Sequence, residues 1–147
     1  MSTAAEREYE ELLAYLSFFA TNVKRVEPTS SSHPANAIKE IVERFGKSKA
    51  LVGLRQATND TVEQMQGWNS KAVGILDQAL QAANTLTASE VRRRYSSSFS
   101  KVVKRGSIKT ETEYYLVTGV VNDIASEVSV QERLSLEHML AAYEAGA

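Results

Sequence analysis

Residues 86–106 read LTASEVRRRYSSSFSKVVKRG, and this stretch decides how the chain folds. Thr87 stands at the position of a helix N-cap, and Glu90 follows three residues later, a spacing that lets the two residues satisfy each other's backbone N–H groups. Leu86 and Val91 flank this pair at the spacing of a hydrophobic staple. The stretch therefore predicts one amphipathic helix, which ends at the glycine that closes the quoted sequence.

The same type of helix start recurs along the chain. A Thr or Ser is followed three residues later by a Glu at three more places: Thr3 and Glu6, Thr110 and Glu113, and Ser129 and Glu132. Apolar residues recur at intervals of three and four, whereas the alternation and the Asn-Gly or Asp-Gly turns of β-hairpins are lacking. We therefore predict an all-α fold, a compact single-domain array of about six or seven antiparallel-packed helices.

Length and composition agree with one self-sufficient domain. The chain has 147 residues, of which 43% are hydrophobic and 24% charged. A chain of this size buries enough apolar surface to fold without a metal or a disulfide. We predict a single helical domain over residues 1–147, in which helix one (residues 4–24) is followed by a polar linker at residues 27–33. The linker leaves open that helix one packs on a second subunit of a homo-oligomer.

Several kinds of chemistry have no signature in the sequence. The chain has no cysteine, which excludes disulfides, thiolate metal sites and cysteine nucleophiles. The two histidines, His33 and His138, are not spaced to hold a metal on one helix face. The glycines are scattered singly rather than gathered in a phosphate-binding loop. We predict no cofactor, no metal site and no catalytic residue, and an unrecognised enzyme is the third-ranked hypothesis for the function.

The sequence contains no signature of a membrane protein. No run approaches the roughly 18 consecutive apolar residues that a membrane span requires. The N-terminus lacks the basic segment and the apolar run of a signal peptide. We therefore predict a cytoplasmic protein without a membrane partner.

Charge is distributed unevenly along the chain, although the formal net charge is only −1. Residues 91–110 contain seven basic side chains and no acidic one, whereas residues 111–147 contain seven acidic side chains and one arginine. On a helical wheel, the apolar side chains of residues 91–103 share one face. The opposite face gathers five basic side chains: Arg93, Arg94, Lys101, Lys104 and Arg105.

This cationic face predicts that the protein recognises another macromolecule. Because opposed charges steer a partner and fix its orientation, we expect a noncatalytic interaction protein such as a regulator, an adaptor or a toxin-neutralising partner. Another protein is the expected partner. Nucleic-acid binding by the basic helix, residues 91–105, is the alternative, since its cations and serines could contact phosphates. A third interpretation is that the acidic C-terminal helices neutralise the cations within the molecule.

Two aromatic residues do not fit the apolar stripes of the predicted helices. Tyr115 lies opposite the stripe of its own helix, and Trp68 stands in a break between two helices. Each is compatible with core packing or with a role as an interface anchor. The residues predicted to bind a partner are Arg92, Arg93, Arg94, Lys101, Lys104, Arg105 and Tyr115.

Overall fold

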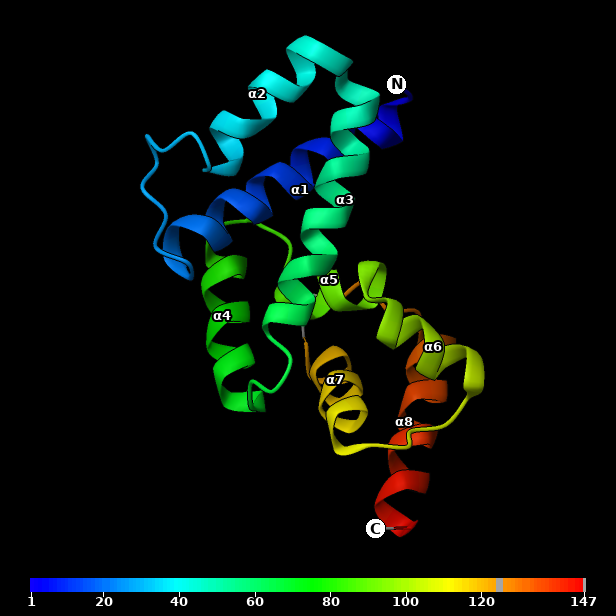
Figure 1. Ribbon diagram of the computed structural model, residues 1–147. Helices are drawn as coiled ribbons and strands as arrows, with labels where there is room; N and C mark the ends of the chain where they lie inside the picture. Colours follow the sequence, from blue (N-terminus) through cyan, green and yellow to red (C-terminus); the bar gives the residue numbers. More distant parts are fainter. Residues whose placement is uncertain (124–125, 147) are drawn as a thin grey trace. The chain divides into compact units, whose positions relative to one another are not determined.

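The computed structural model describes residues 1–123 and 126–146, and the regular structure in these residues is entirely helical (Figure 1). The eight helices in this part of the chain are α1 (Thr3–Asn22), α2 (Pro34–Phe45), α3 (Lys47–Gln64), α4 (Ser70–Ala82), α5 (Ala88–Tyr95), α6 (Ser97–Arg105), α7 (Glu111–Asn122) and α8 (Val130–Gly146). The predicted all-α class is confirmed. The predicted count of six or seven helices is too low for the described residues.

Packing divides the chain into two units, residues Met1–Asp60 and Thr61–Ala147. The division falls within α3, so the last residues of this helix belong to the second unit. The single domain predicted over residues 1–147 stays a prediction. Within the described residues, no helix combines the length and the apolar character that crossing a membrane requires.

The first helix, α1, begins one residue earlier than predicted. Ser2, not Thr3, is the N-cap of α1, because the Ser2 Oγ accepts a hydrogen bond from the Ala5 N–H at 3.2 Å. Serine caps a helix at least as well as threonine. The predicted range 4–24 is therefore corrected to Thr3–Asn22, and the chain turns after the helix at Arg25, whose φ is 60°.

A buried histidine closes the predicted polar linker. His33 is the N-cap of α2: its Nδ1 accepts from the Ala35 N–H at 3.2 Å, and its Nε2 lies 2.8 Å from the Thr21 Oγ1. Because the capping nitrogen must be unprotonated, the hydrogen is on Nε2, which donates to Thr21. His33 thus has a structural role, and it ties the linker to α1.

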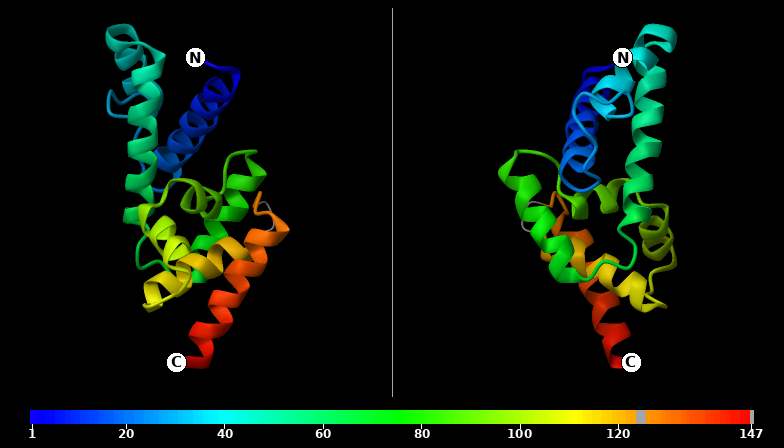
Figure 2. Two further views of the ribbon diagram at one scale, coloured as in Figure 1. Left: turned by 90° about the vertical axis from the view of Figure 1, so that its right-hand side faces the viewer. Right: turned by 60° about the vertical axis from the view of Figure 1, so that its left-hand side comes forward.

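The second unit is built around α7. This helix packs against α4, α5, α6 and α8, and Figure 2 shows α7 and α8 side by side from two directions. The core that these helices share consists of apolar side chains from α6, α7, α8 and the connection before α7. Its buried members are Phe99, Val102, Ile108, Leu116, Val117, Val120, Leu136 and Met139. Burial of each such side chain contributes about 1.5–3 kcal/mol, so α7 is firmly held against α6 and α8.

The single helix predicted over residues 86–106 is wrong, because the structure has two helices there, α5 and α6. Ser96 both ends α5 and caps α6: its N–H donates to the Arg92 O at 3.1 Å, and its Oγ accepts from the Phe99 N–H at 3.1 Å. The Ser96 backbone is extended, with ψ of 119°, so the helical path is interrupted. Phe99, which follows the break at Ser96, still packs in the core. The apolar spacing therefore continues across Ser96 and gives no sign of the break.

Three predicted helix starts are confirmed by their N-caps. The hydroxyl oxygens of Thr87, Thr110 and Ser129 accept hydrogen bonds of 3.0, 3.1 and 3.1 Å from the backbone N–H three residues later. The predicted stop at Gly106 is also confirmed, since this residue adopts the left-handed conformation, with φ of 76°, that favours glycine. Thr87 positions the start of α5, on which the candidate site depends.

Candidate functional site

Two arginines of the predicted cationic face bind carboxylates of the same unit. Glu90 is buried and accepts from Arg93 (Nε at 2.9 Å, Nη2 at 2.7 Å) and from Arg94 (Nε at 2.6 Å). Arg93 also reaches Glu132 at 3.4 Å, and Arg94 reaches Glu127 at 2.9 Å. At these two positions the structure has the intramolecular neutralisation that the acidic C-terminal segment suggested.

Opposing effects set the pKa of Glu90. Burial raises this pKa, whereas the hydrogen bonds and charges of Arg93 and Arg94 lower it. The arginines prevail, and the pKa lies below its usual value of 4.5. A buried carboxylate held by two guanidinium groups stabilises the connection between α5 and the residues before α8. This cluster is therefore a structural element.

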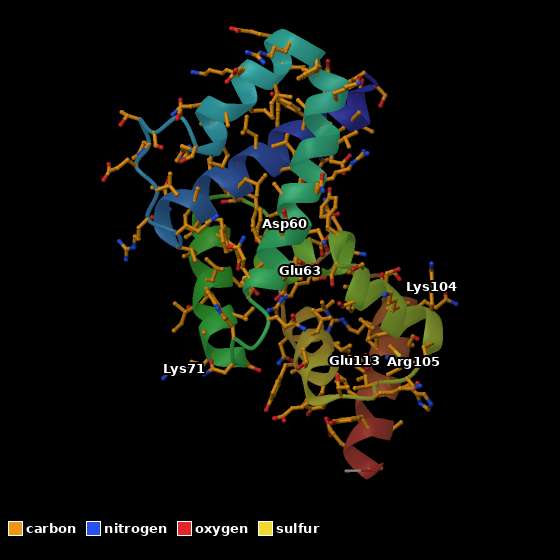
Figure 3. All side chains as sticks on the ribbon, in the orientation of Figure 1. Asp60, Glu63, Lys71, Lys104, Arg105 and Glu113 are labelled. Atoms are coloured by element: carbon orange, nitrogen blue, oxygen red, sulfur yellow. The ribbon has the colours of Figure 1, made fainter. Side chains whose placement is uncertain are left out.

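The exposed cations of the predicted face lie on α6. Arg105 donates from Nη2 to the Glu113 Oε1 at 2.7 Å and so joins α6 to α7. Lys101 and Lys104 are exposed and form no ion pair with any residue in the described part of the chain. Figure 3 shows Lys104 projecting from α6, with Arg105 and Glu113 close together below it. Only two of the six predicted basic residues are thus exposed without an ion pair among the described residues.

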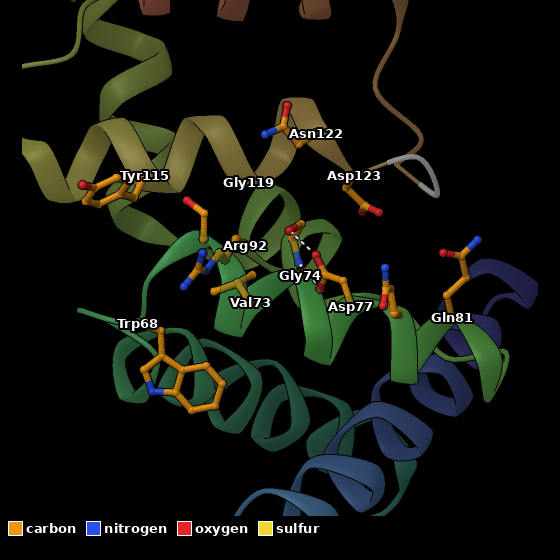
Figure 4. Close-up of a pocket in the computed structure, with 13 residues that line it drawn as sticks. Trp68, Val73, Gly74, Asp77, Gln81, Arg92, Tyr115, Gly119, Asn122 and Asp123 are labelled. Carbon is orange, nitrogen blue, oxygen red and sulfur yellow. Dashed lines mark hydrogen bonds between the residues drawn. The ribbon is translucent and has the colours of Figure 1, made fainter.

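The remaining two predicted residues, Arg92 and Tyr115, line a pocket of about 220 Å³ in the second unit. Figure 4 shows its walls, which come from α4, α5, α7 and the turn before α4. Arg92 is buried, whereas Tyr115 is exposed. The structure thus brings together two residues that the sequence analysis singled out for different reasons, charge and a misplaced aromatic ring.

Two carboxylates stand at one end of the pocket, beside the N-terminus of α5. Asp77 of α4 accepts from the Ser89 N–H at 3.2 Å and from the Ser89 Oγ at 2.5 Å. Asp123, which follows α7, accepts from the Thr87 Oγ1 at 2.6 Å. Burial raises the pKa of Asp77 and the Asp123 charge raises it further, which together outweigh the Ser89 hydrogen bonds. Ionised Asp77 is therefore less stable here than it would be in water.

Aromatic side chains stand at the other end (Figure 4). The backbone N–H of Trp68 and the Nη2 of Arg92 both donate to the carbonyl oxygen of Met65, at 2.9 and 3.4 Å. Arg92 thereby ties the turn that carries Trp68 to α5. Tyr115 donates its hydroxyl to the Glu111 Oε1 at 2.7 Å, and this hydrogen bond raises the tyrosine pKa. The Tyr115 ring is thus held through its hydroxyl, and the backbone of Trp68 is fixed in the turn before α4.

Two glycines shape the pocket walls. A Cβ at Gly119 would lie 3.5 Å from the Ser89 Oγ and 3.7 Å from the Arg92 Nη1, in ordinary contact. A Cβ at Gly74, on α4, would meet no heavy atom within 4 Å. A larger side chain at position 74 therefore has room and would narrow the pocket.

Neither carboxylate of the pocket was predicted from the sequence. Asp77 is a single acidic residue inside α4, and Asp123 stands at the end of α7, so neither belongs to a recognisable motif. The available signals were Trp68 and Tyr115, which did not fit the apolar stripes. Across the described residues, no three or more His, Cys, Asp or Glu side chains are grouped to hold a metal ion.

Comparison with known proteins adds no family to these observations. No protein-family model matches the chain, and neither a curated protein nor a solved structure matches it. Functional proposals therefore rest on the geometry of the second unit.

Proposed function

We propose that this is a noncatalytic, cytoplasmic interaction protein whose pocket receives one side chain of a protein partner. The observation that supports this proposal is the size of the pocket together with its lining. Its volume of about 220 Å³ is below the roughly 300–1,000 Å³ that is usual for small-molecule and cofactor sites. A pocket of this size suits a side chain inserted from a partner better than a nucleotide-sized ligand.

The residues around the opening are of the types that dominate binding energy at protein interfaces. Trp68 and Tyr115 are partly exposed, and the buried Arg92 supports the turn that carries Trp68. Trp, Tyr and Arg are enriched among interface residues whose truncation most weakens binding. Because Arg92 is already bound to the Met65 carbonyl and Tyr115 to Glu111, a partner would lose little affinity to the ordering of these two side chains.

Substitution Gly74→Leu tests the proposal by narrowing the pocket. The wild-type and variant chains serve as baits in cells that express the protein, and the recovered proteins are quantified by mass spectrometry. A stoichiometric partner should be retained by the wild-type bait and lost from the variant. Once identified, the purified partner should bind the variant at least about tenfold more weakly, a difference of about 1.4 kcal/mol.

Gly53→Leu is the matched control. Gly53 is an exposed helical glycine of α3 in the first unit, and a Cβ there also meets no heavy atom within 4 Å. Both substitutions replace glycine inside a helix and should raise helix propensity. The proposal requires that Gly53→Leu retains the partner. Equal recovery on all three baits, or equal loss from both variants, would exclude the pocket as the docking site.

Nucleic-acid binding through residues 91–105 stays a prediction and is the second candidate. The observation in its favour is that Lys101 and Lys104 are exposed on α6. It ranks lower because electrostatic affinity for nucleic acid grows with the number of phosphates neutralised, and the arginines Arg93, Arg94 and Arg105 are engaged by carboxylates. Nucleic acid recovered on the same baits would favour it.

A further inference from the structure

We infer that the side chain received by the pocket is an arginine, whose guanidinium group binds at Asp77 and Asp123. This inference rests on the proposed function and adds the chemical class of the group that is recognised. It follows from the charge of the pocket, from a comparison with Glu90 in the same unit, and from the shape of the guanidinium group.

The side chains that line the pocket carry a formal negative charge. The ionisable side chains lining the pocket are Asp77, Asp123 and Arg92, along with Tyr115. With the tyrosine neutral, the formal sum is one negative charge. The N-terminus of α5 contributes about half a positive charge, which is smaller than the combined negative charge of the two carboxylates beside it. A cation is therefore the complementary ligand for this end.

Glu90 shows how this unit stabilises a buried carboxylate. Glu90 receives two guanidinium groups, and its pKa is lowered. Asp77 receives hydrogen bonds from the uncharged N–H and Oγ of Ser89, and these do not offset burial, which raises the pKa of Asp77. A guanidinium group from a partner would stabilise the ionised carboxylate of Asp77, as the arginines of α5 stabilise that of Glu90.

The arrangement favours guanidinium over ammonium. The planar guanidinium group has five N–H donors in a fixed geometry and can bind two carboxylates at once, whereas ammonium is a compact, strongly hydrated charge. An arginine side chain also packs well against aromatic rings. Trp68 and Tyr115 provide such rings at the opposite end of the pocket (Figure 4), where the rest of the partner's side chain would lie.

The test uses a pair of small probes that differ in charge. N-acetyl-L-arginine amide carries the guanidinium, and N-acetyl-L-citrulline amide is its neutral isostere. The chain has one tryptophan, so the indole N–H resonance of Trp68 in a ¹H–¹⁵N spectrum is an unambiguous reporter. We expect saturable shifts with the arginine probe at a Kd on the order of 1 mM. Citrulline amide should bind at least about tenfold more weakly.

Two variants assign the binding to the carboxylates. Asp77→Asn should abolish the preference for arginine amide over citrulline amide, and Asp123→Asn should reduce this preference. The same spectra show whether each variant is folded. Asp60→Asn, an exposed aspartate of α3 outside the pocket, should leave the preference unchanged. A preference for arginine amide that survives Asp77→Asn would overturn the inference, because the cation would then bind elsewhere.

The outcomes separate this inference from the proposed function. If both probes bind equally and Gly74→Leu blocks both, the pocket is a docking site and the arginine preference is wrong. If neither probe shifts the Trp68 resonance, the arginine preference is likewise overturned, while the bait experiment decides the proposed function independently. If arginine amide binds in the predicted manner but no partner depends on position 74, the proposed function fails instead.

Discussion

Helices α5 and α6 come from one basic stretch of sequence, yet they use their cations differently. On α5, Arg93 and Arg94 are partly buried and bind Glu90. On α6, Lys101 and Lys104 are exposed. The planar guanidinium suits the closely spaced acceptors of a carboxylate, whereas the lysine ammonium is more strongly hydrated. Charge density in a sequence therefore does not locate a binding surface until the acidic residues packed against it are known.

A second contrast separates two carboxylates of the second unit, Glu90 of α5 and Asp77 of α4. Glu90 is held by two guanidinium groups, which lower its pKa despite its burial. Asp77 is held by neutral donors, so burial and the nearby charge of Asp123 raise its pKa. The first arrangement stabilises the fold. The second is unfavourable for the isolated protein, as is common where a residue serves binding rather than stability.

The largest expected effect comes from removing the Glu90 charge. Glu90→Gln leaves two partly buried arginines without their main carboxylate, and loss of one partner of a buried ion pair typically costs about 3 kcal/mol. Glu113→Gln, in the more exposed pair with Arg105, should cost about 1 kcal/mol or less. Urea unfolding measures both. If both variants lost the same unfolding free energy, the distinction between the structural cations of α5 and the cations of α6 would be wrong.

A smaller effect of opposite sign is expected at Asp77. Because its folded pKa is raised, ionised Asp77 opposes folding at neutral pH, and this opposition disappears as the pH falls through the folded pKa. Asp77→Asn should therefore raise the unfolding free energy at pH 7 by about 0.5–1 kcal/mol. A loss of stability at pH 7 would show that Asp77 is structural.

The pH profile of the same variant sharpens the contrast. The folded pKa of Glu90 is depressed, so its contribution is present above pH 4.5 and is lost as the pH falls through the folded pKa. In the wild type, protonation of Asp77 partly offsets this loss. Asp77→Asn removes the offset, so its stability should fall more steeply than that of the wild type between neutral and acidic pH. Identical slopes in thermal unfolding at several pH values would contradict this account.

The helical class and several helix boundaries could be predicted because they depend on local chemistry. The caps at Thr87, Thr110 and Ser129 and the stop at Gly106 need only neighbouring residues. The break at Ser96 was hidden, because three consecutive serines offer competing caps and the apolar spacing continues across the break.

The candidate site could be predicted only in part. Arg92 and Tyr115 were identified from the sequence, although as members of an exposed surface rather than of a pocket. Asp77 and Asp123 could not be found, because only the packing of α4, α5 and α7 brings them to one cavity. The pairing of Arg94 with Glu127 likewise depends on tertiary structure, since no local rule says which acidic residue meets which cation.

The central claim is that the second unit binds its partner through the pocket rather than through the exposed lysines of α6. The most direct measurement is the Kd of the purified partner for two variants, Gly74→Leu and the double substitution Lys101→Glu with Lys104→Glu. The account predicts at least about tenfold weaker binding for Gly74→Leu and a change within about threefold for the lysine variant, whose charges lie outside the pocket. Unchanged binding by Gly74→Leu together with loss of binding by the lysine variant would contradict it.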